Sequence, residues 1–234
     1  MASMNYEQFL IENEHYTYRS LEESGRVKLD GASIIFAYSA DAEIAVDGYK
    51  SIQLTKGSYL ELPSSSVMKY IIRGSGYVVL LTNRSRQSLL EELQDKSLEN
   101  DSYKVAKPWG RELWITGSSP KHSMVLKLIE IKKGTRTSLQ VHQQKYESNF
   151  LCKGEAVFRY SSTRYNGRGE LYAISERTIN SPTILDVEPM TIHQLEAKTD
   201  IVLIEASTDH LDDVIRLQDD SCRSDGRIDS EHTR

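Results

Sequence analysis

From residue 30 onward, short runs of apolar and β-branched residues alternate with turns rich in Gly, Asp and Ser. Runs of about four to eight residues bounded in this way are typical of β-strands. Turn pairs such as Asp47-Gly48 and Lys56-Gly57 lie between them. In the first half of the chain, the predicted strands are residues 32–38, 43–46, 51–54, 59–62, 69–73 and 76–82.

A second series of strand-like runs follows a polar stretch. It comprises residues 113–116, 124–131, 138–142, 147–153, 155–160, 171–174, 183–187, 193–197 and 201–207. Many short strands at regular spacing favour a sandwich or a barrel. We therefore predict an all-β fold.

The polar stretch 83–102 separates the two series. Leu89, Leu90 and Leu93 have helical spacing within it, whereas Leu98 falls one residue off that stripe. We predict a short linker helix that ends before Leu98.

The two series resemble degraded copies of one unit. In each, a strand leads to a proline, Pro63 or Pro189, and a further strand follows. This similarity predicts two modules of about 100 residues each, which is a usual domain size. We expect the modules to span residues 1–95 and 103–220. Residues 221–234 are polar and are expected to form a flexible tail.

Composition and charge narrow the class of protein. The 234 residues are 38% hydrophobic and 27% charged, which is typical of a soluble globular protein. The chain contains no apolar run long enough to cross a membrane and no signal-peptide pattern at its start, so we expect a cytoplasmic protein. The net charge of -5 gives no electrostatic reason to bind nucleic acid or an anionic membrane. The two cysteines, Cys152 and Cys222, predict neither a disulfide framework nor a CxxC site.

The segment 134–154 carries a row of polar side chains. Residues two apart in a strand point to the same face, so Gln140 and His142 project together, and Arg136 and Ser138 share their parity. Four polar side chains on one face of a β-structure are costly to bury unless they bind something. The row therefore predicts a binding site.

Two further side chains complete a set of metal-binding donors. Glu147 begins the next predicted strand after a short turn, and His193 follows about fifty residues after Gln140 and His142. Two imidazoles, a carboxylate and an amide oxygen are suitable ligands for Zn, Mn, Fe, Co or Ni. We predict that these four residues hold a divalent metal ion. The other two histidines of this half before the tail, His122 and His210, are expected on the surface.

The spacing of this segment resembles the first motif of the cupin superfamily. Gly134 is followed by five residues, Gln140, one residue, His142, four residues, Glu147, six residues and Gly154. Because a Gln replaces the usual first His, the site resembles that of mannose-6-phosphate isomerases and their cupin relatives. In that family a Gln-x-His pair, a Glu and a later His hold zinc, so the resemblance favours Zn over the other metals.

Three further segments carry the resemblance across residues 103–220. Lys107-Pro-Trp-Gly110 is similar to the entry segment of type II isomerases, and residues 212–220 are similar to the closing segment of small isomerase-like cupins. Pro189 to His193 matches the second cupin motif, with Met190 where Gly is usual. The resemblance implies two double-stranded β-helix (jelly-roll) modules.

The first module lacks the metal site. His15 is its one histidine and precedes its predicted strands, and the position of the last ligand falls near Val67 and Met68. We expect a metal-free cupin relic that packs against the second module or forms a homodimer interface.

One departure from the type II isomerase pattern concerns charge. The corresponding segment of those enzymes resembles the pattern His-x-His-Arg-Ala-Glu. This chain has Gln144 in place of the second His and Lys145 in place of the Arg. A lysine offers a point charge, whereas an arginine offers a planar fork.

The resemblance implies isomerisation or epimerisation of a sugar or sugar phosphate. A metal can polarise the carbonyl, and a general base must then lie within hydrogen-bond reach of the proton that moves. Lys127, Lys145 and Glu112 are the candidates for this base, and the sequence leaves the choice open. Arg136 or Arg111 would hold a phosphate.

Two alternatives remain from other functional classes. Two His and one carboxylate can form the facial triad of an iron-dependent oxygenase. The chain can also be a non-catalytic carbohydrate-binding module, because one of its two modules has already lost its site. The identity of the bound metal and turnover of a sugar panel distinguish these alternatives from an isomerase.

Overall fold

The computed structural model describes residues 9–64, 66–84, 92–116, 123–167 and 172–232. The chain divides into two compact units, Met1–Ser102 and Tyr103–Arg234. The boundary lies close to the predicted one, but each unit extends further than expected. The first unit includes residues up to 102, and the expected tail belongs to the second unit.

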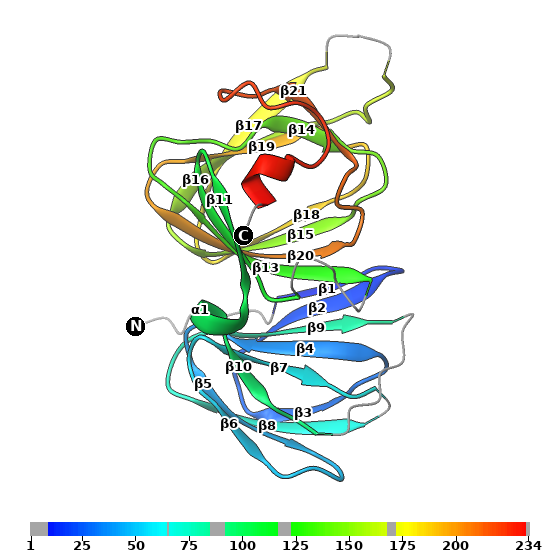
Figure 1. The fold of residues 1–234 in the computed structure, drawn as a ribbon, viewed down its shortest axis with the longest axis vertical. Coiled ribbons are helices and arrows are strands. Elements are labelled where there is room, and N and C mark those ends of the chain that lie inside the picture. Colours follow the sequence, from blue (N-terminus) through cyan, green and yellow to red (C-terminus); the bar gives the residue numbers. More distant parts are fainter. Residues whose placement is uncertain (1–8, 65, 85–91, 117–122, 168–171, 233–234) are drawn as a thin grey trace, which may run out of the picture. The chain divides into compact units, whose positions relative to one another are not determined.

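The first unit consists of two antiparallel sheets (Figure 1). The larger sheet has the order β1 (Leu10–Glu12), β2 (Tyr16–Leu21), β9 (Val78–Asn83), β4 (Ala32–Ala37), β7 (Ser58–Leu62) and β10 (Asp95–Ser97). The smaller sheet has the order β3 (Gly25–Lys28), β8 (Val67–Arg73), β5 (Asp41–Val46) and β6 (Ile52–Leu54).

The core of the first unit lies between these sheets. Every residue of β4 and β9 is buried, as the continuous apolar runs of their sequences require for central strands. The strand β5 alternates, with Ala42, Ile44 and Val46 buried in the core. Alternation of this kind marks a strand with one face on the core and one toward water.

The second unit has the same two-sheet design. One sheet has the order β11 (Tyr103–Lys107), β12 (Gly110–Trp114), β13 (Met124–Ile131), β20 (Ile201–Thr208), β15 (Glu147–Lys153) and β18 (Thr183–Val187). The other has the order β17 (Ile174–Asn180), β16 (Glu155–Ser161), β19 (His193–Ala197), β14 (Leu139–His142) and β21 (Val214–Gln218). Its apolar core includes Trp109, Ile131, Leu151 and Leu203.

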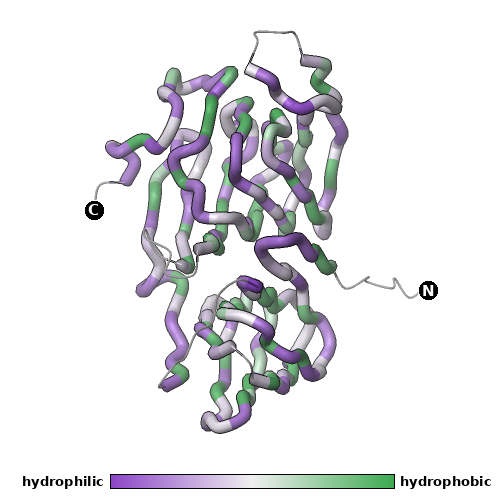
Figure 2. Tube along the Cα trace, turned by 90° about the vertical axis from the view of Figure 1, so that its right-hand side faces the viewer, coloured by the Kyte–Doolittle hydropathy of each residue, from purple (hydrophilic) through white to green (hydrophobic). Residues whose placement is uncertain are grey.

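The strand pattern agrees closely with the sequence in the second unit. The predicted runs 124–131, 147–153, 183–187 and 193–197 have the bounds of β13, β15, β18 and β19. Figure 2 shows hydrophobic and hydrophilic residues alternating along many of the strands. The expected all-β fold is confirmed.

Several strands are absent from the prediction. The edge strands β1, β10, β11 and β21 are short or polar, so their sequences carry little apolar periodicity. The strand β17 was expected at 171–174 but spans Ile174–Asn180, and only Ile179 of it is buried. Its solvent-facing sequence gives no hydrophobic signal. Residue 171 and His122 lie outside the described residues.

The linker helix differs from the expectation. Leu89 and Leu90 lie outside the described residues. In the part that the structure describes, residues 95–97 form β10, and a single helical turn, α1 (Leu98–Asp101), follows. Leu98 therefore begins the helical turn, where the prediction ended the helix before it. Leu98 is buried, so its apolar side chain serves the packing of this turn.

The segment expected to be a flexible tail makes defined contacts in residues 221–232. Its last turn is a 3-10 helix, η1 (Asp229–His232), which is red in Figure 1. Tyr103 Oη donates to the His232 carbonyl at 2.7 Å, and Lys107 Nζ lies 2.7 Å from Glu231. Polar contacts of this kind, rather than apolar burial, hold the segment, which explains why its composition suggested a loose end.

None of the helices within the described residues is long and apolar enough to cross a membrane.

Candidate metal centre

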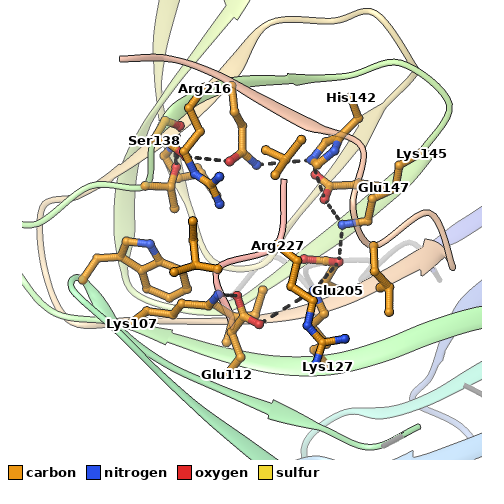
Figure 3. Close-up of a pocket in the computed structure, with 18 of the residues that line it drawn as sticks. Lys107, Glu112, Lys127, Ser138, His142, Lys145, Glu147, Glu205, Arg216 and Arg227 are labelled. Atoms are coloured by element: carbon orange, nitrogen blue, oxygen red, sulfur yellow. Dashed lines mark hydrogen bonds and ion pairs between the residues drawn. The ribbon is translucent and has the colours of Figure 1, made fainter. Parts of the chain in front are cut away.

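A cavity lies inside the second unit, between its two sheets (Figure 3). Side chains from β12, β13, β14, β15, β19, β20 and β21 line it, together with residues of the C-terminal segment. Its volume is about 130 Å³. Its lining combines apolar side chains, including Trp109, Ile131 and Leu203, with a dense group of charged residues.

Three of the four predicted metal ligands meet at this cavity. One donor atom each from His142, Glu147 and His193 lies within 4.8 Å of the others. Glu147 Oε1 is 3.4 Å from His142 Nε2, and Glu147 Oε2 is 3.1 Å from His193 Nε2. The three residues are 6%, 4% and 7% exposed. The strand order explains the meeting, because β14 pairs with β19 whereas Glu147 begins β15 in the facing sheet.

Both imidazoles present Nε2 to this cluster. Nδ1 of His142 lies 2.8 Å from the Asp213 carboxylate, and Nδ1 of His193 lies 2.9 Å from the Thr191 carbonyl. An acceptor at Nδ1 fixes its proton there, so the lone pair of Nε2 faces the site. Metal-binding histidines commonly have an outer partner of this kind. Asp213 was not among the candidates from the sequence.

The carboxylate of the cluster is held ionised. Burial alone would raise the pKa of Glu147, but the Lys145 charge and His142 keep that pKa well below its usual range. Burial likewise opposes the charged form of His142, yet the nearby Glu147 raises the pKa of His142 overall. A metal ion therefore competes with a proton for His142 Nε2, as at metal sites generally.

Gln140 adjoins the cluster but presents its amide nitrogen to it. Nε2 of Gln140 is 3.3 Å from His142 Nε2 and 3.5 Å from His193 Nε2. Its Oε1 accepts a hydrogen bond from Ser138 Oγ at 2.6 Å. Rotating the amide by half a turn would place the oxygen on the cluster and the nitrogen on Ser138 Oγ, which can also accept. Ligation by Gln140 stays a prediction.

The donor set fits a divalent metal ion. Two imidazole nitrogens, one ionised carboxylate and an adjacent amide converge from rigid strands, and both imidazoles have outer partners. Within the described residues, this is the one group of three His, Cys, Asp or Glu side chains close enough to share an ion. The first unit thus has no such cluster among its described residues. At its expected ligand position, Val67 is exposed and Met68 is packed in the core.

A row of buried ion pairs extends from the cluster. Lys145 Nζ lies 2.5 Å from Glu147 Oε1 and 3.1 Å from Glu205 Oε1. Lys127 Nζ lies 3.2 Å from the same Glu205 oxygen, which also accepts from Ser207 Oγ at 3.0 Å. Lys127 and Glu205 are direct cross-strand partners on β13 and β20.

The row continues through Glu112. Its carboxylate lies 3.9 Å from Lys127 Nζ and 3.7 Å from Lys107 Nζ, and it accepts from Trp114 Nε1 at 2.6 Å. Lys127 Nζ also lies over the Trp114 ring, 4.4 Å from its centroid. Burial would raise the pKa of Glu112, but Lys127 and Lys107 lower that pKa overall.

The structure brings the three candidate bases, Lys127, Lys145 and Glu112, into one cavity with the metal cluster. Their charges differ from the expectation. Burial opposes the charged form of Lys145, but Glu147 and Glu205 raise its pKa above the ordinary lysine value. Lys145 is therefore a fixed cation at neutral pH and a poor general base. Glu205, missed from the sequence, is the carboxylate between the two lysines.

The two candidate phosphate-binding arginines lie elsewhere. Arg136 forms a bidentate ion pair with Asp220 at 2.7 and 2.8 Å and does not line the cavity. Arg111 pairs with Glu130, and both side chains are largely exposed. The parity argument for Arg136 fails because β14 begins only at Leu139, and the register of its pairing shifts between Leu139 and Gln140.

The arginines that do line the cavity come from the C-terminal segment. They are Arg216 on β21, Arg223 and Arg227. The resemblance to a closing segment pointed to residues 212–220, but nothing in the sequence directed these side chains inward.

Comparison with known proteins by sequence gives no match. No family model matches the chain, and no curated protein matches it.

Comparison of structures does give matches. The chain is similar to vicilin from Corylus avellana (hazelnut), with a TM-score of 0.63 and 8% identity over 83% of this chain and 76% of that one. It is similar to a glyoxylate-induced protein from Pseudomonas aeruginosa, with a TM-score of 0.63 and 11% identity over 85% of this chain and 79% of that one. It is also similar to the formate complex of Lactobacillus farciminis oxalate decarboxylase, with a TM-score of 0.59 and 9% identity over 90% and 86% of the two chains.

These neighbours define the class of fold. The chain shares with them a fold of two jelly-roll modules. The predicted architecture of two jelly-roll modules is confirmed. At these identities the similarity extends to the fold alone.

Proposed function

We propose that the second unit is a metal-dependent cupin enzyme that isomerises or epimerises an anionic sugar derivative, such as a sugar phosphate. The observation that carries the proposal is the position of the buried row Glu147, Lys145, Glu205 and Lys127, which starts at the metal cluster and lines the same cavity. Buried charges are costly, and they gather where a protein needs them for binding or proton transfer.

The metal ligands in this proposal are His142, Glu147 and His193, with Gln140 as the fourth through its amide oxygen. The resemblance to mannose-6-phosphate isomerases favours Zn²⁺, and the donor set also suits Mn, Fe, Co and Ni. A bound divalent ion would polarise a carbonyl oxygen of the ligand.

The chain's own residues supply fixed charge and a proton acceptor. Lys145 stays protonated and faces the cavity, so its ammonium can stabilise negative charge on a substrate oxygen. Glu205 Oε1 is held by Lys127, Lys145 and Ser207, whereas its Oε2 makes no hydrogen bond with a described residue. This arrangement supports Glu205, rather than Lys145, as the carboxylate that moves a proton.

The test combines metal content with solvent exchange. Purified protein is analysed for bound metals and then incubated in deuterium oxide with a panel of aldoses, ketoses and their phosphates. Isomerisation or epimerisation through proton transfer places deuterium on the substrate carbon, which proton NMR detects. Oxygen consumption without deuterium exchange would instead identify an oxygenase, and binding without turnover would identify a carbohydrate-binding module.

A second candidate is metal-dependent cleavage of a small carboxylic acid. The cavity volume of about 130 Å³ favours it, because pockets for drug-sized ligands usually measure about 300–1,000 Å³. One structural neighbour is an oxalate decarboxylase with formate bound. Release of carbon dioxide and formate from oxalate, in the absence of activity on sugars, would favour this candidate.

A further inference from the structure

The charged residues of the cavity are unequally paired. Lys107, Lys127 and Lys145 each lie within 4 Å of at least one carboxylate of the cavity wall or of η1. Arg216, on β21, also lines the cavity but forms no ion pair with any described residue. Arg216 is half-buried, and a cation without an ion-pair partner in a cavity is the natural place for a negatively charged ligand group.

The position of Arg216 is set by the sheet. In the pairing of β14 with β21, Arg216 is the direct partner of Gln140. Side chains directly opposite on an antiparallel pair lie on the same face, with their Cβ atoms about 5 Å apart. Since Gln140 Nε2 lies 3.3 and 3.5 Å from the Nε2 atoms of His142 and His193, Arg216 adjoins the metal cluster. Figure 3 shows its guanidinium directed into the cavity.

The guanidinium is held from one side and open on the other. Its Nη1 donates to the carbonyl oxygens of Ser224 and Gly226, the latter at 2.8 Å. Its Nη2 donates to no described residue, and its Nε is buried without a hydrogen-bond partner, so two donors of the fork are left unsatisfied. Burial, and then the nearby Arg223 charge, lower the pKa of Arg216, although the charges of Asp219, Glu231 and Asp225 act in the opposite direction.

We infer that Arg216 binds the oxyanion group, a phosphate or a carboxylate, of the ligand that occupies this cavity. The inference rests on the proposed function insofar as the cavity is the ligand site, and it gives Arg216 the role that the sequence assigned to Arg136. The short separation from the metal cluster suits a compact ligand that places one oxygen at the metal and its oxyanion at the arginine.

The test measures anion binding by calorimetry on the full-length, zinc-loaded protein, with orthophosphate and acetate as the probes. Arg216→Met should weaken the binding of at least one probe by about tenfold or more, because a charge-assisted hydrogen bond is lost. The probe that loses affinity distinguishes a phosphate site from a carboxylate site. Arg136→Met is the matched control, since Arg136 pairs with Asp220 outside the cavity, and should change the affinity less than twofold.

A loss of less than threefold in Arg216→Met, or no binding of either anion to the unaltered protein, would overturn the inference. The Tm of Arg216→Met can fall because its contacts with Ser224 and Gly226 are lost. In that case Arg216→Lys replaces it in the binding measurement. That variant keeps the charge without the fork, so a loss above threefold supports the inference and an unchanged affinity overturns it. If Arg216→Met exchanges solvent deuterium into the substrate at the unaltered rate, the inference about Arg216 fails while the proposed function stands.

Discussion

Replacement of Lys145 by Met tests whether the buried charges depend on one another. The ammonium lies 2.5 Å from Glu147 and 3.1 Å from Glu205, and all three side chains are buried. The variant leaves Glu147 facing Glu205 with no cation between them, and Glu205 keeps only Lys127. Breaking a buried ion pair by removing one partner typically costs about 3–5 kcal/mol. For a domain of this size, that loss lowers the Tm by about 10 °C or more.

Tryptophan fluorescence gives a clean measurement of this effect. Both tryptophans of the chain, Trp109 and Trp114, are buried in the second unit, so their emission follows the unfolding of that unit alone. The matched control is Lys198→Met, which removes a lysine paired with Glu196 on the surface. Exposed pairs contribute about 0–1 kcal/mol, so the control should melt close to the unaltered protein.

A metal ion should reduce the effect of Lys145→Met. A divalent cation at the cluster compensates the Glu147 charge that the lysine no longer balances, so the variant should regain part of its stability when zinc is added. Bound metal also stabilises the folded state by mass action, which the same titration of the unaltered protein measures. A loss below about 1 kcal/mol in the metal-free variant would refute the view that Lys145 holds the two carboxylates together.

Four further outcomes follow from the structure. His142→Ala should lose stoichiometric metal in elemental analysis, whereas His210→Ala, which removes a side chain bonded to Thr208, should keep it. Asp213→Asn should weaken zinc affinity by about 10–100-fold in a competition assay with a chelator, because it removes the outer partner of His142; an unchanged affinity would exclude that role. A fragment of residues 1–102 should fold and carry no metal, so stoichiometric metal on it would contradict the assignment of a metal-free first unit. Met190→Gly should raise the free energy of unfolding by about 1 kcal/mol or less, because Met190 has φ 68°; a loss of stability in denaturant titration would contradict this.

The meeting of the candidate metal ligands could be predicted because their spacing carries the geometry. Gln140 and His142 occupy alternate positions of one strand. Glu147 begins the next strand, and this strand has the same bounds as the predicted run 147–153. The presence of Met190 where the motif usually has Gly can also be related to the structure. Glycine is usual there because the backbone is left-handed, and the Met190 amide donates to the His142 carbonyl at 2.7 Å, which ties this turn to the ligand strand.

The charged residues beyond the metal cluster could not be predicted in the same way. Parity placed Arg136 with the ligands, but the irregular start of β14 breaks that parity and leaves Arg136 on the surface. Glu205 did leave a signal, since it is a single carboxylate within the apolar run of β20, as Lys127 is a single lysine within β13. The pairing of Lys127 with Glu205 depends on β13 and β20 being neighbours in the sheet. The order of the strands along the sequence does not contain that information.

The presence of buried charges beside apolar side chains in one cavity argues for a specific ligand rather than for a structural role of these charges. Replacing a buried ion pair by apolar residues of similar volume is often neutral or stabilising, so a barrel selected for stability alone has no need of one. The same cavity is also lined by Trp109, Ile131 and Leu203, and the latter two lie on the strands that carry Lys127 and Glu205, which shows that these strands can fill the interior with apolar side chains. The row of buried ion pairs, in contrast, runs directly from the metal cluster. A ligand that meets both kinds of side chain has carbon-bound hydrogens beside oxygen atoms, as the sugar derivatives of the proposed function do.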